Sequence, residues 1–301
     1  MEIKKKILII FLSIYLIIGS LNSIKTGISF DENYEELNWN FHKDLILELK
    51  DKFLLGKEFN KKKFEYEVQG FVGYGIGFQI VSQPIQHFLQ DILAQDNKIS
   101  LYGAKLLSKH FVVFLFFFIS GIFFYLILRK LIENENFCIL GLIIYLTYPY
   151  LFGQSMFSPK DVPFLSVWVM CTFLSFNFIE KIIDNKTINL NNVLIFSLAT
   201  SYLISIRIAG ILIFLQYFFL LILYFSIYKE NVIKFFKNFY LKIIIFIVGV
   251  VILTFLLNPI FLIDPSLIIT TIKINANHFN NVGTTTFGRI MYAQDLPSTY
   301  I

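Results

Sequence analysis

Asp31 and Glu32 follow directly on an apolar N-terminal run and open a long hydrophilic segment. A carboxylate of suitable pKa can act as a general base and take a proton from a hydroxyl or amine nucleophile. The pair also has a structural explanation. Asp31 is a favourable N-cap for a following helix, and Glu32 would complement the positive end of the helix dipole. One carboxylate can do both, so the sequence leaves the two interpretations open.

Lys160 and Asp161 form a second charged pair, which stands between Pro159 and Pro163 at the start of another apolar run. The structural interpretation is a proline-shaped turn with an interfacial charge pair. The functional interpretation brings the Lys160 ammonium to a phosphate, and the Asp161 carboxylate to a metal ion or an acceptor near Asp31. Both interpretations remain open.

Arg207 stands between two long apolar runs. An ionisable side chain at such depth commonly faces a cavity or a charged partner, and a guanidinium at the ends of two helices suits a lipid phosphate. The alternative is that Arg207 snorkels to the interface. His278 lies in an asparagine-rich tail, where no second histidine stands at ligand spacing. The tail therefore does not predict a zinc site.

The composition places these residues in a membrane protein. Of 301 residues, 56% are hydrophobic, 18% aromatic and 16% charged, which is far outside the range of a soluble domain. The net charge of +5 would suggest a nucleic-acid partner in a soluble protein, but here the lysines serve as topology signals and no nucleic acid is expected.

Seven apolar runs are long enough to cross a hydrocarbon core. We therefore expect an all-α polytopic membrane protein with a single transmembrane domain over residues 1–301. The expected helices cover residues 7–24, 111–128, 137–153, 162–179, 191–206, 208–228 and 243–263.

The distribution of Lys and Arg orients this predicted bundle. If the seven runs alternate, the basic residues of the short loops all fall on one side, which is the cytoplasm by the positive-inside rule. The opposite side receives an outer loop at residues 25–110, the turn at Lys160, the corner at Arg207 and an outer tail at residues 264–301. We expect an integral protein of a bacterial inner membrane whose site faces the periplasm.

The outer loop carries two predicted amphipathic surface helices. In the first, apolar residues recur every three or four positions before a stop signal at Gly56, and neighbouring charges favour a position along the membrane surface. Its stripe comprises Tyr34, Leu37, Phe41, Leu45, Leu49 and Phe53. The second runs from Gln83 to Leu93, with Pro84 in its first turn. The glycine-rich residues 70–77 lack a Walker lysine, so we expect a flexible backbone there and not a nucleotide loop.

Several segments, taken in order, carry a resemblance to a known family. They are the Ser29-Phe30-Asp31-Glu32 opening, the Lys109-His110 entry to the second helix, the turn at residues 158–164, the corner at residues 205–210 and the tail from His278 to Tyr300. Their order and sidedness resemble the GT-C glycosyltransferases of the protein O-mannosyltransferase and aminoarabinose-transferase type. The resemblance covers nearly the whole chain.

The resemblance implies a GT-C-type helical bundle that takes a hexose or pentose from a polyprenyl-phosphate donor and transfers it, with inversion, to an acceptor on the outer face. A protein, a lipid or a cell-envelope glycan would serve as acceptor. The resemblance assigns the catalytic base to Asp31, with Glu32 beside it. It assigns donor-phosphate binding first to Arg207 and second to Lys160.

Metal use differs among the proteins resembled. Some employ a divalent cation, Mg or Mn, with an acidic residue where Asp161 stands, whereas the protein O-mannosyltransferase branch does not clearly need one. Asp161 and His278 are thus the candidates for contact with a metal or with the acceptor. No soluble cofactor is implied.

Two other classes stay open. A polytopic transporter would carry ionisable residues at mid-membrane and paired repeats of broken helices, whereas the predicted spans are almost free of charge. A non-catalytic membrane subunit of an envelope-glycan pathway would tolerate loss of the acidic pair. Proteins of the resembled type continue into further helices, so the chain to Ile301 is expected to be a C-terminally shortened form or a fragment.

Overall fold

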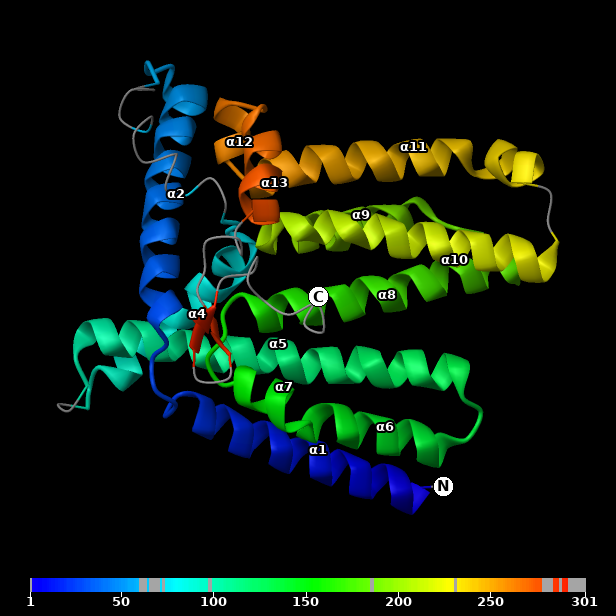
Figure 1. The fold of residues 1–301 in the computed structure, drawn as a ribbon, viewed down its shortest axis with the longest axis horizontal. Helices are drawn as coiled ribbons and strands as arrows, with labels where there is room; N and C mark the ends of the chain where they lie inside the picture. Colours follow the sequence, from blue (N-terminus) through cyan, green and yellow to red (C-terminus); the bar gives the residue numbers. More distant parts are fainter. Residues whose placement is uncertain are drawn as a thin grey trace.

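The computed structural model describes residues 2–59, 64, 71, 74–96, 99–184, 187–229, 232–277, 284–286 and 289–291. This part of the chain is helical apart from its connections and one small two-stranded hairpin. Figure 1 shows a bundle of helices that run side by side, with the long helix α2 (Phe30–Leu55) lying across one end. We call this the α2 end of the bundle and the opposite end the loop end.

Five helical segments within the described residues are long and apolar enough to cross a membrane. They belong to α1 (Glu2–Ser23), α5 (Leu101–Leu131), α8 (Asp161–Ile183), the pair η1 (Ile208–Leu212) and α10 (Ile213–Tyr228), and α11 (Val232–Leu257). Three further apolar helices within the described residues, α6 (Glu135–Thr147), α9 (Leu190–Ile206) and α13 (Leu267–Asn277), are shorter. The chain is therefore an integral membrane protein with a helical membrane part.

Two of the predicted helices are interrupted at prolines. Residues 137–153 divide into α6 and α7 (Pro149–Gln154), because Pro149 has no N–H to donate and disfavours helical geometry at Tyr148. Residues 243–263 divide at Pro259 into α11 and α12 (Ile260–Ile263). α11 also begins well before residue 243, since long lysine side chains are tolerated in a helix that reaches the interface.

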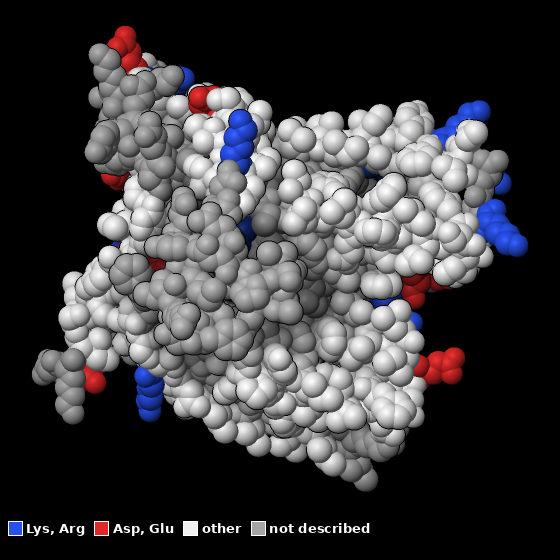
Figure 2. Space-filling model, in the orientation of Figure 1, with Lys and Arg blue, Asp and Glu red and all other residues white. Residues whose placement is uncertain are grey.

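The centre of the bundle lies between α1, α5, α6, α8 and α9. Its buried side chains include Phe114 and Phe117 of α5, Leu146 of α6 and Leu203 of α9. The Tyr15 hydroxyl of α1 donates to the Leu146 carbonyl at 2.6 Å, which ties the first helix to the bundle. Figure 2 shows an uncharged surface along the bundle, with Lys, Arg, Asp and Glu near its two ends.

The face of α2 that packs against the rest of the protein contains both polar and apolar side chains. Its buried residues are Glu32, Glu35, Glu36, Asn38, Phe41, His42 and Leu45. Leu37 and Phe53 of the predicted apolar stripe are exposed, so the stripe does not define the buried face. Cations of α5 and of the segment before α8 pair with the buried acids, which offsets the cost of burying them. α2 ends at Gly56, which adopts the left-handed conformation with φ 66°.

The start of α2 differs from the prediction. Ser29 is the N-cap, and Asp31 lies inside the first turn. The Ser29 N–H donates to Glu32 Oε1 at 2.6 Å, which is one half of a capping box. Asp31 is therefore not needed as a cap, and its side chain is exposed.

α4 (Gly77–Leu93) packs against α5 and α9 and starts earlier than predicted. Pro84 consequently lies in its interior and not in the first turn. The expectation of a flexible glycine segment also fails at Gly75 and Gly77. A Cβ at either position would lie within 2.2 Å of a Ser205 oxygen, so these glycines allow close packing on the end of α9. Other glycines of this segment lie outside the described residues.

The chain after α11 folds over the α2 end. α12 buries Ile260 and Phe261 against Phe41 and Leu45 of α2. α13 (Leu267–Asn277) follows and contacts η1. Two short antiparallel strands, β1 (Thr284–Thr286) and β2 (Arg289–Met291), complete the described part.

Candidate functional site

A solvent-exposed ion pair between Arg207 and Asp161 lies at the α2 end of the bundle. Arg207 ends α9 because its backbone is extended (φ −146°, ψ 135°), and Asp161 is the first residue of α8. Arg207 Nη1 lies 2.7 Å from Asp161 Oδ1, and the two side chains are 41% and 60% exposed. The Ser158 hydroxyl lies 3.4 Å from the other Asp161 oxygen. The fold thus joins the turn at Lys160 to the corner at Arg207.

Lys160 occupies a more enclosed position beside this pair. Its ammonium lies 2.5 Å from Glu35 Oε1 and 4.0 Å from the centre of the Tyr74 ring. Gln79 Nε2 of α4 donates to the other oxygen of Glu35 at 3.2 Å. Lys160 therefore links α2, the segment before α4 and the start of α8, and its charge is already balanced.

We call the side chains of Asp31, Glu35, Tyr74, Gln79, Lys160, Asp161 and Arg207 the cluster. The pKa of Tyr74 shows which charged groups of the cluster influence it. Partial burial and the carboxylates of Glu35 and Asp31 raise the pKa of its phenol, and the Arg207 guanidinium opposes the rise. Asp31, Glu35 and Arg207 thus all act on one side chain. The pKa of Tyr34, whose ring centre lies 4.7 Å from that of Tyr74, is raised by burial, by Tyr74 and by Glu35. The predicted convergence of Asp31 with Arg207 is compatible with this field.

Glu32 lies on the other side of α2, away from solvent. Its Oε2 is 2.8 Å from Nε2 of the buried His110, and the opposite ring nitrogen donates to the Ser23 carbonyl at 3.0 Å. The hydrogen bonds of Glu32 and His110 hold together the end of α1, the start of α2 and α5. Within this structure Glu32 has a positioning role and is not open to a substrate.

Glu36 is the most strongly held acid of α2. Its two oxygens pair with Lys109, at 2.5 Å, and with Lys105. Burial raises the pKa of the Glu36 carboxyl, but the two ammonium groups outweigh burial and keep the pKa below its usual value. Asp31 differs from its three neighbours, since it is exposed and makes no ion pair within the described part of the chain.

The cluster also contains residues that sequence analysis did not select. Glu35 follows Asp31 by four positions, so helical periodicity could have placed the two carboxylates on one face. Tyr74 and Gln79 gave no comparable signal, because their role depends on the packing of residues 74–79 against α9. His278 lies outside the described residues.

Within the described part of the chain, the cluster provides no recognised set of metal ligands. Among the described residues, no group of three or more His, Cys, Asp and Glu side chains is arranged to hold a metal. The carboxylate of Asp161 is also engaged by Arg207. A cavity behind Tyr74, next to Gly75 and Asn258, has a volume of about 10 Å³, which is too small for a sugar. The solvent-accessible part of the cluster is therefore the exposed side of Asp31, Asp161 and Arg207.

Comparison of the chain with protein-family models, with curated proteins and with solved structures finds no match. The function is therefore inferred from the residues of the site itself.

Proposed function

We propose that this protein is a membrane glycosyltransferase that moves a sugar from a polyprenyl-phosphate donor to an acceptor on the outer face of the membrane. The observation that carries the proposal is the contrast at the start of α2. Asp31 is an exposed, unpaired carboxylate within the described residues, and it shares the field of Tyr74 with the exposed guanidinium of Arg207.

In the proposed reaction, Asp31 takes the proton from the acceptor hydroxyl or amine. The acceptor atom attacks the anomeric carbon, and the bond from that carbon to the phosphate oxygen breaks with inversion. Arg207 stabilises the charge that develops on the leaving phosphate. Its pairing with Asp161 uses one nitrogen, and a guanidinium has five N–H donors, so donors remain for the phosphate.

The resemblance suggests that Lys160 binds the donor phosphate, but in this proposal Lys160 positions other residues. Its ammonium is balanced by Glu35 and covered by the Tyr74 ring. We assign it the role of holding Tyr74 and Glu35 in place beside Asp31. The site would lie at the outer face because the basic short-loop residues gather at the loop end.

Asp31→Asn tests the proposal, with Asp44→Asn as matched control, because Asp44 is an exposed aspartate of the same helix. The assay follows release of polyprenyl phosphate from a panel of polyprenyl-phosphate-linked hexoses and pentoses, with host membranes supplying acceptors. Loss of a positioned general base should slow transfer by roughly 10²–10⁴-fold. The control should keep normal turnover. Unchanged turnover in folded Asp31→Asn protein would remove Asp31 as the base, and absence of turnover in the wild type would favour a non-catalytic subunit.

A further inference from the structure

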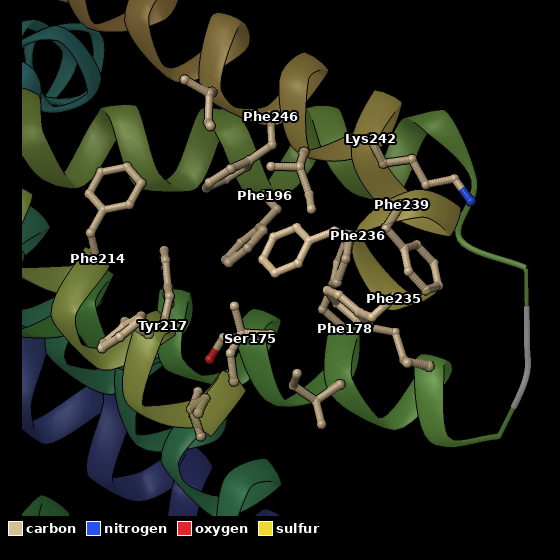
Figure 3. Close-up of a pocket in the computed structure, with 17 residues that line it drawn as sticks. Ser175, Phe178, Phe196, Phe214, Tyr217, Phe235, Phe236, Phe239, Lys242 and Phe246 are labelled. Atoms are coloured by element: carbon tan, nitrogen blue, oxygen red, sulfur yellow. The ribbon is translucent and has the colours of Figure 1, made fainter. Parts of the chain in front are cut away.

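A second, larger cavity lies in the membrane part of the protein. It has a volume of about 280 Å³ and is bounded by α8, α9, α10 and α11. Figure 3 shows aromatic rings around it, including Phe178, Phe196, Phe236 and Phe246. Apart from Ser175, Tyr217 and Lys242, its lining side chains are apolar. Such a cavity does not hold water well and favours a hydrocarbon occupant.

The cavity lies between two places where α10 approaches α11. At one place the rings of Phe214 and Phe246 are 6.1 Å apart, and at the other Phe225 and Phe235 are 5.2 Å apart. Phe218 lines the cavity between these contacts and is 60% exposed. The cavity is therefore a groove that opens sideways between two membrane helices, where a lipid chain can enter.

Lys242 supplies the one charged side chain of this groove. In Figure 3 its nitrogen points away from the rings and toward the loop end. Lys242 makes no ion pair within the described part of the chain, and its nearest aromatic partner is Phe239, with the ammonium 5.3 Å from the ring centre. The loop end also carries most of the basic short-loop residues, which by the positive-inside rule face the leaflet that is rich in anionic lipid.

We propose that this groove binds one acyl chain of an anionic phospholipid from the leaflet at the loop end, with Lys242 contacting the phosphate. The volume suits a single hydrocarbon chain, since it lies below the usual range of roughly 300–1,000 Å³ for compact small-molecule sites. The charge of Lys242 selects an anionic headgroup over a zwitterionic one. The proposal is independent of the glycosyltransferase assignment, because neither Asp31 nor Arg207 lines the groove.

Native mass spectrometry of the full chain, released from detergent micelles, tests the headgroup. Phosphatidylglycerol and phosphatidylcholine with the same acyl chains are the probes. The wild type should bind phosphatidylglycerol about fivefold more tightly, and Lys242→Gln should remove that preference. Lys237→Gln should keep it, because Lys237 is exposed on the same helix and does not line the groove. Equal binding of the two lipids by the wild type, or equal losses in the two variants, overturns the proposal.

Phosphatidylglycerol with a photoactivatable group near the end of one acyl chain tests the position. Crosslinks should fall on residues 214–221 and 235–247, and Leu220→Trp, which fills the groove, should abolish them. Should Leu220→Trp not fold, Lys242→Gln provides the second test, with about fivefold weaker labelling. Labelling elsewhere overturns the proposal. Displacement of the label by polyprenyl phosphate also overturns it and would identify an isoprenoid as the occupant.

Discussion

The acids in the first two turns of α2 divide into a buried group and an open one. Glu32 and Glu36 face α5, where His110, Lys105 and Lys109 enclose them. Asp31 is exposed and, like Arg207 of the exposed Asp161–Arg207 pair, acts on the pKa of Tyr74. Residues of one chemical type, within one short stretch of helix, are thus placed in opposite environments.

The buried and the exposed carboxylates of α2 should differ in what their replacement changes, which is stability for the buried ones and catalysis for the exposed one. A buried carboxylate that loses its cation, or a cation that loses its carboxylate, leaves an unpaired charge in a poorly polarisable environment, which is strongly destabilising. An exposed carboxylate can be replaced with little structural cost but can still exchange protons with a substrate. We therefore expect the buried group to control the free energy of unfolding and the open group to control turnover.

Glu36→Gln should have the largest effect on stability. The change removes the charge that balances Lys109, whose side chain is 1% exposed. Breaking such a pair from one side costs about 3–5 kcal/mol, which unfolding in micelles of increasing SDS content would measure. A double variant, Glu36→Met with Lys109→Met, should recover much of this loss because no buried charge remains. If the double variant is as unstable as the sum of its single changes, packing and not charge dominates this interface.

His42 gives the buried side of α2 a pH dependence. Burial lowers the pKa of its imidazole from 6.5 to about 4, although the Asn38 carbonyl at 2.9 Å acts in the opposite direction. Between these two values the unfolded chain binds more protons than the folded one, so stability falls as the pH drops from 6.5 to 4. The full loss is about 3 kcal/mol and does not grow further below pH 4 on account of this residue.

Thermal unfolding measured from pH 8 down to about pH 3 would follow this dependence. His42→Gln should flatten the curve between pH 6.5 and 4, while a further loss below pH 4.5 should remain. That second loss belongs to Glu36, whose lowered pKa makes its contribution disappear only as the pH falls through the folded value. An unchanged curve in His42→Gln would assign the dependence to another group.

The sequence predicted the membrane class and the helical content because composition and the length of apolar runs depend on the bilayer alone. It predicted the end of α2 at Gly56, since a left-handed cap is a local requirement. It did not predict the breaks at Pro149 and Pro259, since it expected continuous helices over residues 137–153 and 243–263. It also did not predict which residues α2 buries, because apolar spacing says nothing about cations that arrive from α5 and from the turn before α8.

At the candidate site, too, some residues could be predicted from the sequence and others could not. Asp31, Lys160, Asp161 and Arg207 each carried a local signal, a charge beside an apolar run. Glu35 and Tyr74 complete the cluster, yet their importance depends on three-dimensional packing that joins α2 to the ends of α8 and α9. The Asp161–Arg207 pair spans two helices, so single-sequence spacing could not have paired them.

Arg207→Lys tests whether the exposed Arg207 binds the donor phosphate. Lysine keeps the positive charge but loses the planar set of donors that suits a phosphate. We expect the KM for the polyprenyl-phosphate donor to rise about tenfold, equal to about 1.4 kcal/mol, with kcat little changed. Arg129→Lys is the matched control, because Arg129 also makes an exposed ion pair, 3.0 Å from Glu135, at the loop end. Equal rises in KM for the two variants would contradict donor binding at Arg207.

Gly56→Ala should show that the far end of α2 is independent of the acids at its start. Gly56 has φ 66°, and an added Cβ would meet no atom within 4 Å, so the cost comes from the backbone conformation alone. That cost is about 1 kcal/mol in unfolding free energy, and sugar transfer should be unaffected. Gly27→Ala provides the control, since Gly27 has equal space but no positive φ. A loss of transfer activity in Gly56→Ala would mean that the cap positions Asp31 through the length of the helix, and the two ends of α2 could then no longer be treated as separate.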